Sequence, residues 1–212
     1  MIQFFGVFAC ISIVIAAGWR LISRRVSLPC PSWLAWLVEA ETPFAKQYNA
    51  ESVIRHLNLA GGMNVLDAGC GPGRVTIPVA KALGSGGYVT AVDIQSRMLD
   101  RVRVKAAAAN LTNIHFVNVP IESGTLGESR FDRVLLVTVL GEIPDRAAAL
   151  RAIHRLLNPD GFLSITEILA DPHYQSRKTI LRLAGAAGFR ERAFFGNRFS
   201  FTVHREKSQH NK

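Results

Sequence analysis

The sequence has little cysteine and little acid for its length. Its 212 residues include three Cys, at positions 10, 30 and 70, without the close spacing of a metal site. Three scattered cysteines are also too few for a disulfide framework, so a reducing compartment is expected and no metal centre is predicted. Internal repeats and low-complexity tracts are absent as well. The length therefore fits one domain of ordinary size with an additional segment.

Acidic residues are outnumbered by basic ones, 16 Asp and Glu against 25 Lys and Arg, which gives a net charge of +9. The excess is concentrated from His173 to Lys212, where nine Lys and Arg face two Glu. A basic end of this kind indicates an anionic partner surface, either a membrane or a nucleic acid. A solvated charged face is the alternative interpretation.

Charge is missing altogether from the first 19 residues, and Arg20, Arg24 and Arg25 follow directly. About 20 apolar residues span a bilayer as a helix, and a cleaved signal carries its positive charge before the apolar run rather than after it. The positive-inside rule then puts the rest of the chain in the cytoplasm. We therefore predict a single-pass membrane protein with a retained anchor. A cleaved signal and a buried helix are the alternatives.

A short aromatic segment follows the predicted anchor. Trp33 and Trp36 lie three residues apart, which favours one face of a helix at the depth of lipid headgroups. In the alternative interpretation, both indoles belong to the core of the domain. Residues 1–44 are thus assigned to the anchor helix and an amphipathic juxtamembrane segment.

From residue 45 onward, strand patterns alternate with helix patterns. The expected strands are residues 64–69, 86–94, 113–119, 131–140 and 162–169, and the expected helices are residues 73–84, 95–111, 145–161 and 176–189. Residues 190–196 and 200–206 are expected to form a terminal hairpin. The pattern predicts an α/β domain over residues 45–212. Its expected architecture is a doubly wound, mostly parallel, Rossmann-like seven-stranded sheet with a C-terminal antiparallel hairpin.

The most informative stretch is VLDAGCGPGRV, residues 65–75, in which an apolar run ends at Asp67 and glycines follow at 69, 71 and 73. In such a sheet, the loop after the first strand lies at the ligand-binding edge. The loop lacks the Gly-Lys-Ser/Thr ending of a phosphate-binding loop, and its third glycine comes one residue too early for a dinucleotide fingerprint. A carboxylate at this place repels a pyrophosphate and suits a ligand that carries an ammonium group.

VLDAGCGPG resembles motif I, D-x-G-x-G-x-G, of the class I S-adenosylmethionine-dependent methyltransferases. Asp93 ends VTAVDI as the family's acid ends its second strand. SRMLDR, FDRVLLVTVLGEIPD and LLNPDGFLSITE are similar to the next helix, the fourth strand with its loop, and the turn into the fifth strand. The resemblance covers about residues 45–205, and quinone and phospholipid methyltransferases are similar in core sequence. It implies S-adenosylmethionine as the cofactor.

The resemblance also implies cofactor contacts, residue by residue. Gly69 and Gly71 are expected to let the cofactor approach the backbone, Asp67 to serve its methionine end, and Asp93 to accept from both ribose hydroxyls. The full predicted set is Asp67, Gly69, Cys70, Gly71, Gly73, Asp93, Ile94, Met98, Ile121 and Thr138. The chain departs from the family at Pro120, near the place of an Asp that often reads the adenine amino group. Ile121 or Glu122 is expected to take part of that role.

Methyl transfer requires alignment of the acceptor and exclusion of water, and it requires a base where the acceptor holds a proton. Candidates should follow the fourth and fifth strands, and Glu142, His173 and Tyr174 are predicted as catalytic residues on that ground. His173 titrates near neutrality and stands beside a hydroxyl in sequence, which suits a base. The alternative is that His173 is a surface loop residue.

The leading hypothesis is a membrane-anchored methyltransferase that acts on a lipid or hydrophobic small molecule, with the bilayer as a partner. Residues 29–44 are then expected to form one wall of the acceptor pocket. A nucleic acid partner is disfavoured, because the Asn/Asp-Pro-Pro-Tyr motif of base methyltransferases is missing. The alternatives are an anchored methyltransferase with a soluble small-molecule, nucleic acid or protein acceptor, and a non-catalytic membrane-tethered interaction module. The sequence leaves the oligomeric state open.

Overall fold

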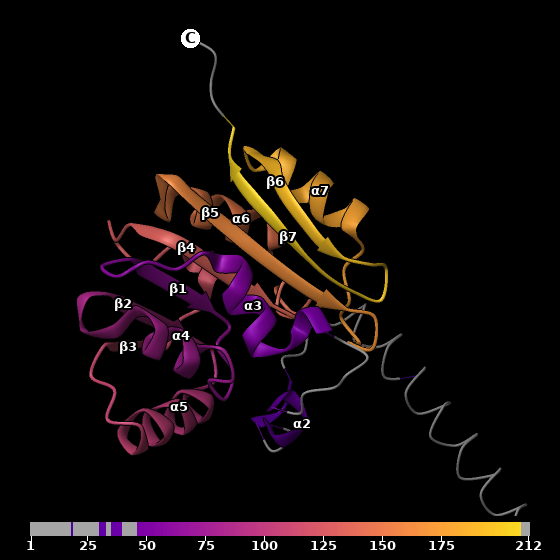
Figure 1. The fold of residues 1–212 in the computed structure, drawn as a ribbon. Coiled ribbons are helices and arrows are strands. Elements are labelled where there is room, and N and C mark those ends of the chain that lie inside the picture. The colour runs from indigo at the N-terminus through magenta and orange to yellow at the C-terminus, as the bar shows by residue number, and fades with distance from the viewer. Residues whose placement is uncertain (1–17, 19–29, 33–34, 40–45, 209–212) are drawn as a thin grey trace, which may run out of the picture.

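The structure, a computed structural model, describes residues 18, 30–32, 35–39 and 46–208 (Figure 1). Its centre is a seven-stranded sheet in the order β3-β2-β1-β4-β5-β7-β6. The strands are β1 (Asn64–Ala68), β2 (Tyr88–Val92), β3 (Ile114–Val117), β4 (Phe131–Val137), β5 (Leu157–Ile168), β6 (Phe189–Gly196) and β7 (Ser200–Lys207). The first five are parallel, and β7 pairs antiparallel with both β5 and β6. The predicted Rossmann-like α/β sheet with its antiparallel hairpin is confirmed.

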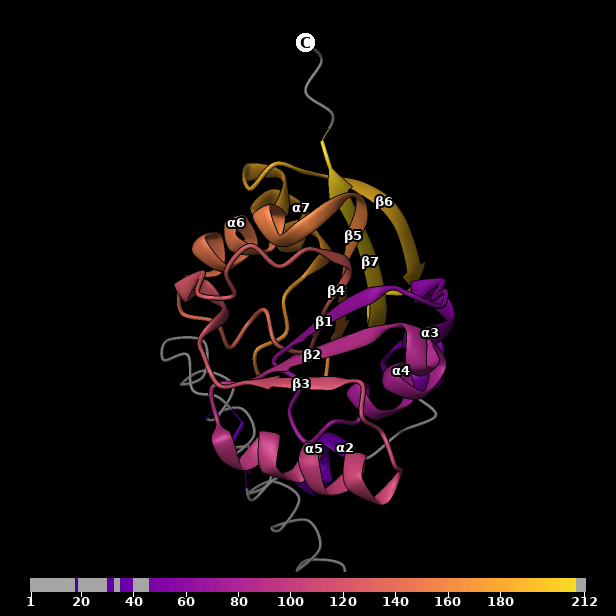
Figure 2. The same cartoon turned by 90° about the vertical axis from the view of Figure 1, so that its left-hand side faces the viewer.

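Helices cover both faces of this sheet, as the two views show (Figures 1 and 2). One face carries α3 (Ala50–Leu57), α4 (Thr76–Leu83) and α5 (Ser96–Ala108), and the other carries α6 (Arg146–Leu156) and α7 (Arg177–Ala186). The described chain also contains the short α2 (Ala35–Glu39) and the 3-10 turns η2 (Lys46–Tyr48), η3 (Gly84–Gly86) and η4 (Ile121–Ser123).

The doubly wound arrangement follows from the apolar character of the strands. Val65 packs with the α3–α5 layer and its neighbour Leu66 with the α6–α7 layer, because successive side chains of a strand point to opposite faces. Both side chains are fully buried. A strand that is buried on both faces reads as a continuous apolar run, and each large side chain buried in it contributes about 1.5–3 kcal/mol. The two layers hold the strand ends rigidly, which positions the loops between them.

The helix expected over residues 145–161 is shorter in the structure. α6 ends at Leu156, and the Asn-Pro-Asp-Gly turn belongs to the bulged beginning of β5. Pro159 has no N–H to continue a helix, and the side-chain amide of Asn158 donates to Asp132 on β4 at 2.7 Å. The turn is therefore held by the sheet rather than by the helix.

The predicted localisation, a single membrane pass with the catalytic domain in the cytoplasm, is corrected. Within the residues that the structure describes, no helix combines the length and the apolar character needed to cross a bilayer. The apolar run that motivated the prediction, residues 1–19, lies outside the described residues except for Gly18.

Candidate functional site

A cavity of about 600 Å³ opens at the carboxyl ends of the parallel strands, next to the point between β1 and β4 where the strand order reverses. Ligands of doubly wound sheets bind at this point. Much of the wall is apolar, and its polar side chains form two groups. One group contains Asp93 beside the glycine loop, and the other contains Glu142, Asp171 and His173.

The glycine loop is fastened to the end of β2. The N–H of Gly69 donates to the carbonyl oxygen of Val92 at 2.8 Å. The N–H groups of Gly71 and Gln95 donate to the two carboxylate oxygens of Asp93 at 2.9 and 2.8 Å. Burial raises the pKa of Asp93, and these two bonds oppose the shift. Each oxygen keeps a further lone pair, so Asp93 can fix the loop and accept from a ligand at the same time.

The glycines of the loop also have packing reasons. Gly69 has a φ of +76°, and a Cβ there would lie 2.5 Å from a methyl group of Val139, in the loop after β4. Gly73 has a φ of +85°, and a Cβ there would lie 3.0 Å from Val102 on α5. Gly69 and Gly71 border the cavity, whereas Cys70 and Gly73 lie in the packing behind it.

Asp67 lies behind the loop and is 2% exposed. The hydroxyl of Thr76, the first residue of α4, donates to its Oδ2 at 2.6 Å. Burial raises the pKa of Asp67 to about 6, against the lowering effects of Thr76 and the Arg74 guanidinium. Asp67 therefore ties β1 to α4 from outside the cavity wall that the described residues form. Its service to the methionine end of the cofactor stays a prediction.

The wall beside Asp93 fits a nucleoside. Ile94 is 53% exposed although it lines the cavity, while Met98 and Ile121 in the same wall are buried. An exposed isoleucine next to a buried carboxylate provides an apolar surface for a flat base and an acceptor for ribose hydroxyls. Glu122 joins the wall directly after Ile121. The residues present thus fit the adenosine part of S-adenosylmethionine.

The residue that directly follows β4 is strained and also lines the cavity. Thr138 has a φ of +57°, which is unusual for a β-branched side chain. Its N–H donates to the carbonyl oxygen of Thr166 on β5 at 2.8 Å. Its hydroxyl donates to the carbonyl oxygen of Val137 at 2.7 Å. The neighbouring strand therefore holds a conformation that costs of order 1–3 kcal/mol, at the start of the loop that carries Glu142.

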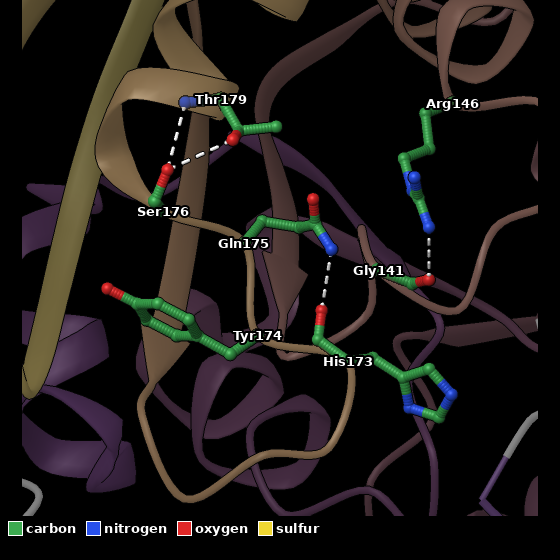
Figure 3. A pocket seen from close by; sticks show the side chains of 7 residues that line it. All are labelled: Gly141, Arg146, His173, Tyr174, Gln175, Ser176 and Thr179. Carbon is green, nitrogen blue, oxygen red and sulfur yellow. Dashed lines mark hydrogen bonds between the residues drawn. The ribbon is translucent and has the colours of Figure 1, made fainter. Parts of the chain in front are cut away.

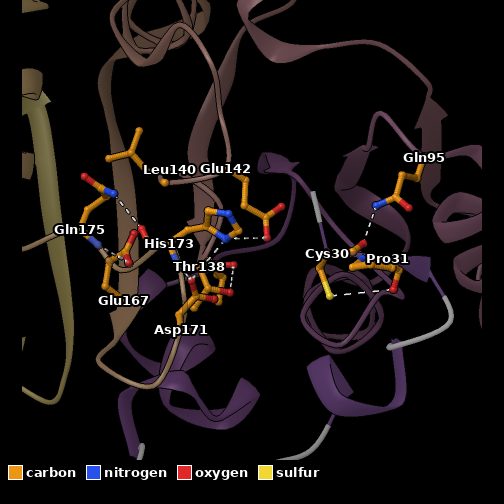
Figure 4. Close-up of polar contacts among 12 residues, drawn as sticks. Cys30, Pro31, Gln95, Thr138, Leu140, Glu142, Glu167, Asp171, His173 and Gln175 are labelled. Carbon is orange, nitrogen blue, oxygen red and sulfur yellow. Dashed lines mark hydrogen bonds and ion pairs between the residues drawn. The ribbon is translucent and has the colours of Figure 1, made fainter. Parts of the chain in front are cut away.

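The second polar group joins the loops after β4 and β5 (Figure 4). His173 Nδ1 lies 3.9 Å from Glu142 Oε1 and 3.9 Å from Asp171 Oδ1. The imidazole is buried, and its Nε2 has no hydrogen-bond partner among the described residues. Burial, aided by Arg146, lowers the pKa of His173, and burial, aided by Asp171, raises that of Glu142 to about 8. At neutral pH, a neutral imidazole thus stands beside a protonated carboxyl.

Tyr174 points away from this group, into a polar pocket of about 350 Å³ (Figure 3). Its hydroxyl donates to the carbonyl oxygen of Arg198 at 3.2 Å, near the tip of the β6–β7 hairpin. His173 borders both spaces, whereas Tyr174 borders this one. The structure therefore brings Glu142 and His173 together and separates Tyr174 from them.

Part of the N-terminal segment lies against the cavity. Cys30 and Pro31 belong to its wall, and the side-chain amide of Gln95 donates to the carbonyl oxygen of Cys30 at 2.8 Å. Trp36 is 65% exposed, so its indole is not part of the core. Trp33 lies outside the described residues. For the rest of the segment, a place in the acceptor wall stays a prediction.

The wall also contains residues that the predicted site does not include, and Gln95 and Tyr48 are two of them. Gln95 follows Asp93 by two positions, so the sequence indicated that the loop after β2 borders the site. It did not indicate that the Gln95 side chain itself lines the cavity. Tyr48 precedes β1 on the turn η2, outside every recognised motif, and folding brings it into the wall. No local signal marks it, because its place depends on how η2 packs against the sheet.

Comparisons with known proteins agree with this geometry. Residues 65–161 match the family described as a methyltransferase domain. A demethylmenaquinone methyltransferase of Staphylococcus aureus is 32% identical over 115 residues, which cover 54% of this chain and 47% of the relative. A ubiquinone biosynthesis O-methyltransferase of Albidiferax ferrireducens is 28% identical over 154 residues, or 71% of this chain and 58% of the relative. The chain spans about half the length of the curated relatives it matches.

Solved structures share the fold. A SAM-dependent methyltransferase from Aquifex aeolicus matches with a TM-score of 0.72 at 20% identity, over 83% of this chain and 98% of that one. Magnesium protoporphyrin IX methyltransferase from Synechocystis, solved with bound S-adenosylmethionine, matches with a TM-score of 0.68 at 22% identity, over 90% of this chain and 97% of that one. The motif, the cavity and the comparisons agree: residues 65–161 match a methyltransferase domain, the fold is that of S-adenosylmethionine-dependent methyltransferases, and the residues of the cavity fit S-adenosylmethionine as the cofactor.

Proposed function

We propose that the protein transfers a methyl group from S-adenosylmethionine to a hydrophobic small molecule with a quinol-type ring. The observation that carries the proposal is one continuous cavity that joins Asp93 to the Glu142–His173 pair through a largely apolar wall. Such a wall desolvates an apolar ring at little cost and offers few partners to a sugar or a phosphate. The apolar wall residues from the end of β5 and from the loops that carry Glu142 and His173 are Val139, Ile143, Pro144, Ile168, Ala170 and Pro172.

The relatives support the ring class. One is named for demethylmenaquinone and one for the O-methylation of a ubiquinone precursor, and both names refer to quinones. A ring hydroxyl is common to the reduced forms of such acceptors, whether the methyl group goes to an oxygen or to a ring carbon. Both cases require removal of a proton from that hydroxyl, and a general base in the site would remove it.

The protein's own groups then have distinct roles. When bound, S-adenosylmethionine supplies an activated methyl group on a positively charged sulfur. Asp93 accepts from the ribose hydroxyls, and Ile94 covers the base. The neutral imidazole of His173 takes the proton of the ring hydroxyl, and the Asp171 carboxylate, 3.9 Å from Nδ1, stabilises the imidazolium that forms. The protonated carboxyl of Glu142 orients the acceptor by donating a hydrogen bond.

The test is methyl transfer from labelled S-adenosylmethionine to two probes, a short-chain reduced demethylmenaquinone and an alkyl catechol. At least one methylated product is expected, identified by mass spectrometry. His173→Ala is expected to lower kcat by roughly 100- to 10,000-fold if it is the base. His115→Ala on β3 is the matched control, since His115 is exposed and outside the cavity wall. Wild-type protein that binds the cofactor but methylates neither probe contradicts the proposal.

A further inference from the structure

Glu167 is a buried acid on β5 that the proposed reaction does not use. It is 1% exposed, stands one position before the end of the strand and lies outside the wall of the cavity. Side chains two positions apart on a strand share a face, so Glu167 points to the same α6–α7 layer as the core residues Leu163 and Ile165. An apolar side chain would complete this row without burying a polar group, so core packing does not explain the acid.

The carboxyl of Glu167 holds the far end of the loop that carries His173. Its Oε2 accepts from the backbone N–H of Gln175 at 3.0 Å, and its Oε1 has no hydrogen-bond partner among the described residues. Burial raises the pKa of Glu167 well above its ordinary value, against the effect of this hydrogen bond. A neutral carboxyl therefore fastens the loop to the strand without adding a charge to the site.

Gln175 connects this contact to the backbone of His173. Its side-chain Nε2 donates to the carbonyl oxygen of His173 at 2.7 Å (Figures 3 and 4). A Cβ on Gly141 would collide with the same carbonyl oxygen, so that oxygen is confined by two neighbours. The N–H of His173 donates to Asp171 Oδ1 at 2.6 Å. Hydrogen bonds thus lead from Glu167 through Gln175 to the residue that carries the imidazole.

The loop depends on such contacts because open space lies on two sides of it. Asp171 and Pro172 border the cavity of about 600 Å³, and Tyr174 and Gln175 border the polar pocket of about 350 Å³. His173 borders both spaces. A segment with few packed neighbours is held weakly by burial, so hydrogen bonds decide where its backbone lies.

We propose that Glu167 is a positioning residue for methyl transfer, which holds the imidazole of His173 in place through Gln175. The inference rests on the proposed function, in which His173 is the base, and deepens it. A base must lie within hydrogen-bond reach of the proton that it removes, and a misplacement of about 1 Å can cost on the order of 100-fold in rate. Because Glu167 lies outside the cavity wall, its effect on the rate is exerted through the loop.

Two substitutions at position 167 separate the hydrogen bond from the volume of the side chain. Glu167→Leu removes the acceptor of the Gln175 N–H, whereas Glu167→Gln keeps a neutral acceptor at the same place. Glu167→Leu is expected to lower kcat for the methylated probe roughly 10- to 100-fold, and Glu167→Gln is expected to stay near wild type. A wild-type kcat in Glu167→Leu overturns the proposal, and so do equal losses in the two variants.

Stability and cofactor binding are measured on the same samples. The affinity for S-adenosylmethionine is expected to stay unchanged in Glu167→Leu. Its melting temperature is not expected to fall, because the unpartnered Oε1 leaves with the carboxyl. Ser164→Ala is the matched control, since it removes another buried oxygen of β5 that has no partner among the described residues. A kcat loss in Glu167→Leu that is matched by an equal loss of cofactor affinity overturns the proposal.

Gln175→Leu breaks the next hydrogen bond of the chain from the side of the loop. It is expected to lower kcat as Glu167→Leu does, and to add little in the Glu167→Leu background, because the two residues act through one contact. Additive losses would overturn the proposed connection. If Glu167→Leu does not fold, Gln175→Leu decides alone, and a wild-type kcat in this variant overturns the proposal.

An NMR titration of His173 keeps the inference separate from turnover. The imidazole faces Arg146 on α6, Glu142 in the loop after β4 and Asp171 on its own loop, and burial, aided by Arg146, lowers its pKa. In Glu167→Leu the loosened loop admits water, so the pKa of His173 is expected to rise towards its ordinary value.

The titration uses the full chain with S-adenosylhomocysteine bound, and His173→Ala identifies the signal. A raised pKa in Glu167→Leu without methylation of a probe by wild type contradicts the proposed reaction and supports the positioning role. An unshifted titration overturns the positioning role, whether or not wild type methylates a probe.

Discussion

A Cβ atom on Gly141 would lie 1.9 Å from the carbonyl oxygen of His173 and 2.7 Å from its Cβ. The loops after β4 and β5 therefore meet backbone to backbone, with no room for a side chain between them. Gly141 directly precedes Glu142, so this contact sets how the carboxyl and the imidazole face each other.

Gly141→Ala is expected to displace His173 and to lower the free energy of unfolding by about 1–3 kcal/mol, because the atoms in the way are backbone. Misplacement of the base by about 1 Å should reduce kcat on the order of 100-fold. Gly185→Ala on α7 is the matched control. A Cβ there meets nothing within 4 Å, and alanine should stabilise the helix by about 0.5–1 kcal/mol. Melting temperature and kcat are measured on both; a Gly141→Ala protein with wild-type values would disprove the tight contact.

Asp93→Ala is expected to weaken S-adenosylmethionine binding roughly 10- to 150-fold, since charge-assisted hydrogen bonds to ribose are lost. The same carboxylate holds the N–H groups of Gly71 and Gln95, so a lower melting temperature should accompany the loss. Calorimetry measures the affinity. Asp100→Ala on α5 controls for charge, because Asp100 pairs with Arg103 on the exposed helix surface. Equal affinities of folded Asp93→Ala and Asp100→Ala proteins would take Asp93 out of the site.

Glu142 is expected to make stability fall as pH rises. Burial raises its pKa from 4.5 to about 8, so between these values the folded state binds more protons than the unfolded chain. The free energy of unfolding then decreases with pH across this window, and the stabilisation is lost as the pH passes about 8. Glu142→Gln is neutral at every pH. Its free energy of unfolding should therefore be equal to or lower than that of wild type at the acidic end and higher than that of wild type at the basic end. Urea unfolding at both ends checks this; parallel pH profiles would refute the raised pKa.

Short-range patterns in the sequence predicted the sheet and the hairpin, and the resemblance of VLDAGCGPG to motif I implied the cofactor. Mostly apolar runs such as Val65–Ala68 predict strands that are buried on both faces. Successive side chains of a strand point to opposite faces, and each face packs against a layer of helices. Asp93 was predictable because it ends a strand at a known spacing from the glycine loop, and the carboxyl ends of parallel strands share one edge. These signals lie in the strand and in the loop that directly follows it.

The tertiary structure decided which side chains share a space. Asp67 and Tyr174 carry suitable groups, yet packing turns Asp67 behind the loop towards Thr76 and Tyr174 towards the hairpin. Tyr48 has no motif, and the contact with Arg74, 26 positions away, brings it into the cavity. In the sequence, Gly141 is an ordinary loop glycine. Only the fold places the backbone of His173, in the loop after β5, directly against it. Loop side chains are directed by contacts between segments that are distant in sequence, and a local pattern carries no information about such contacts.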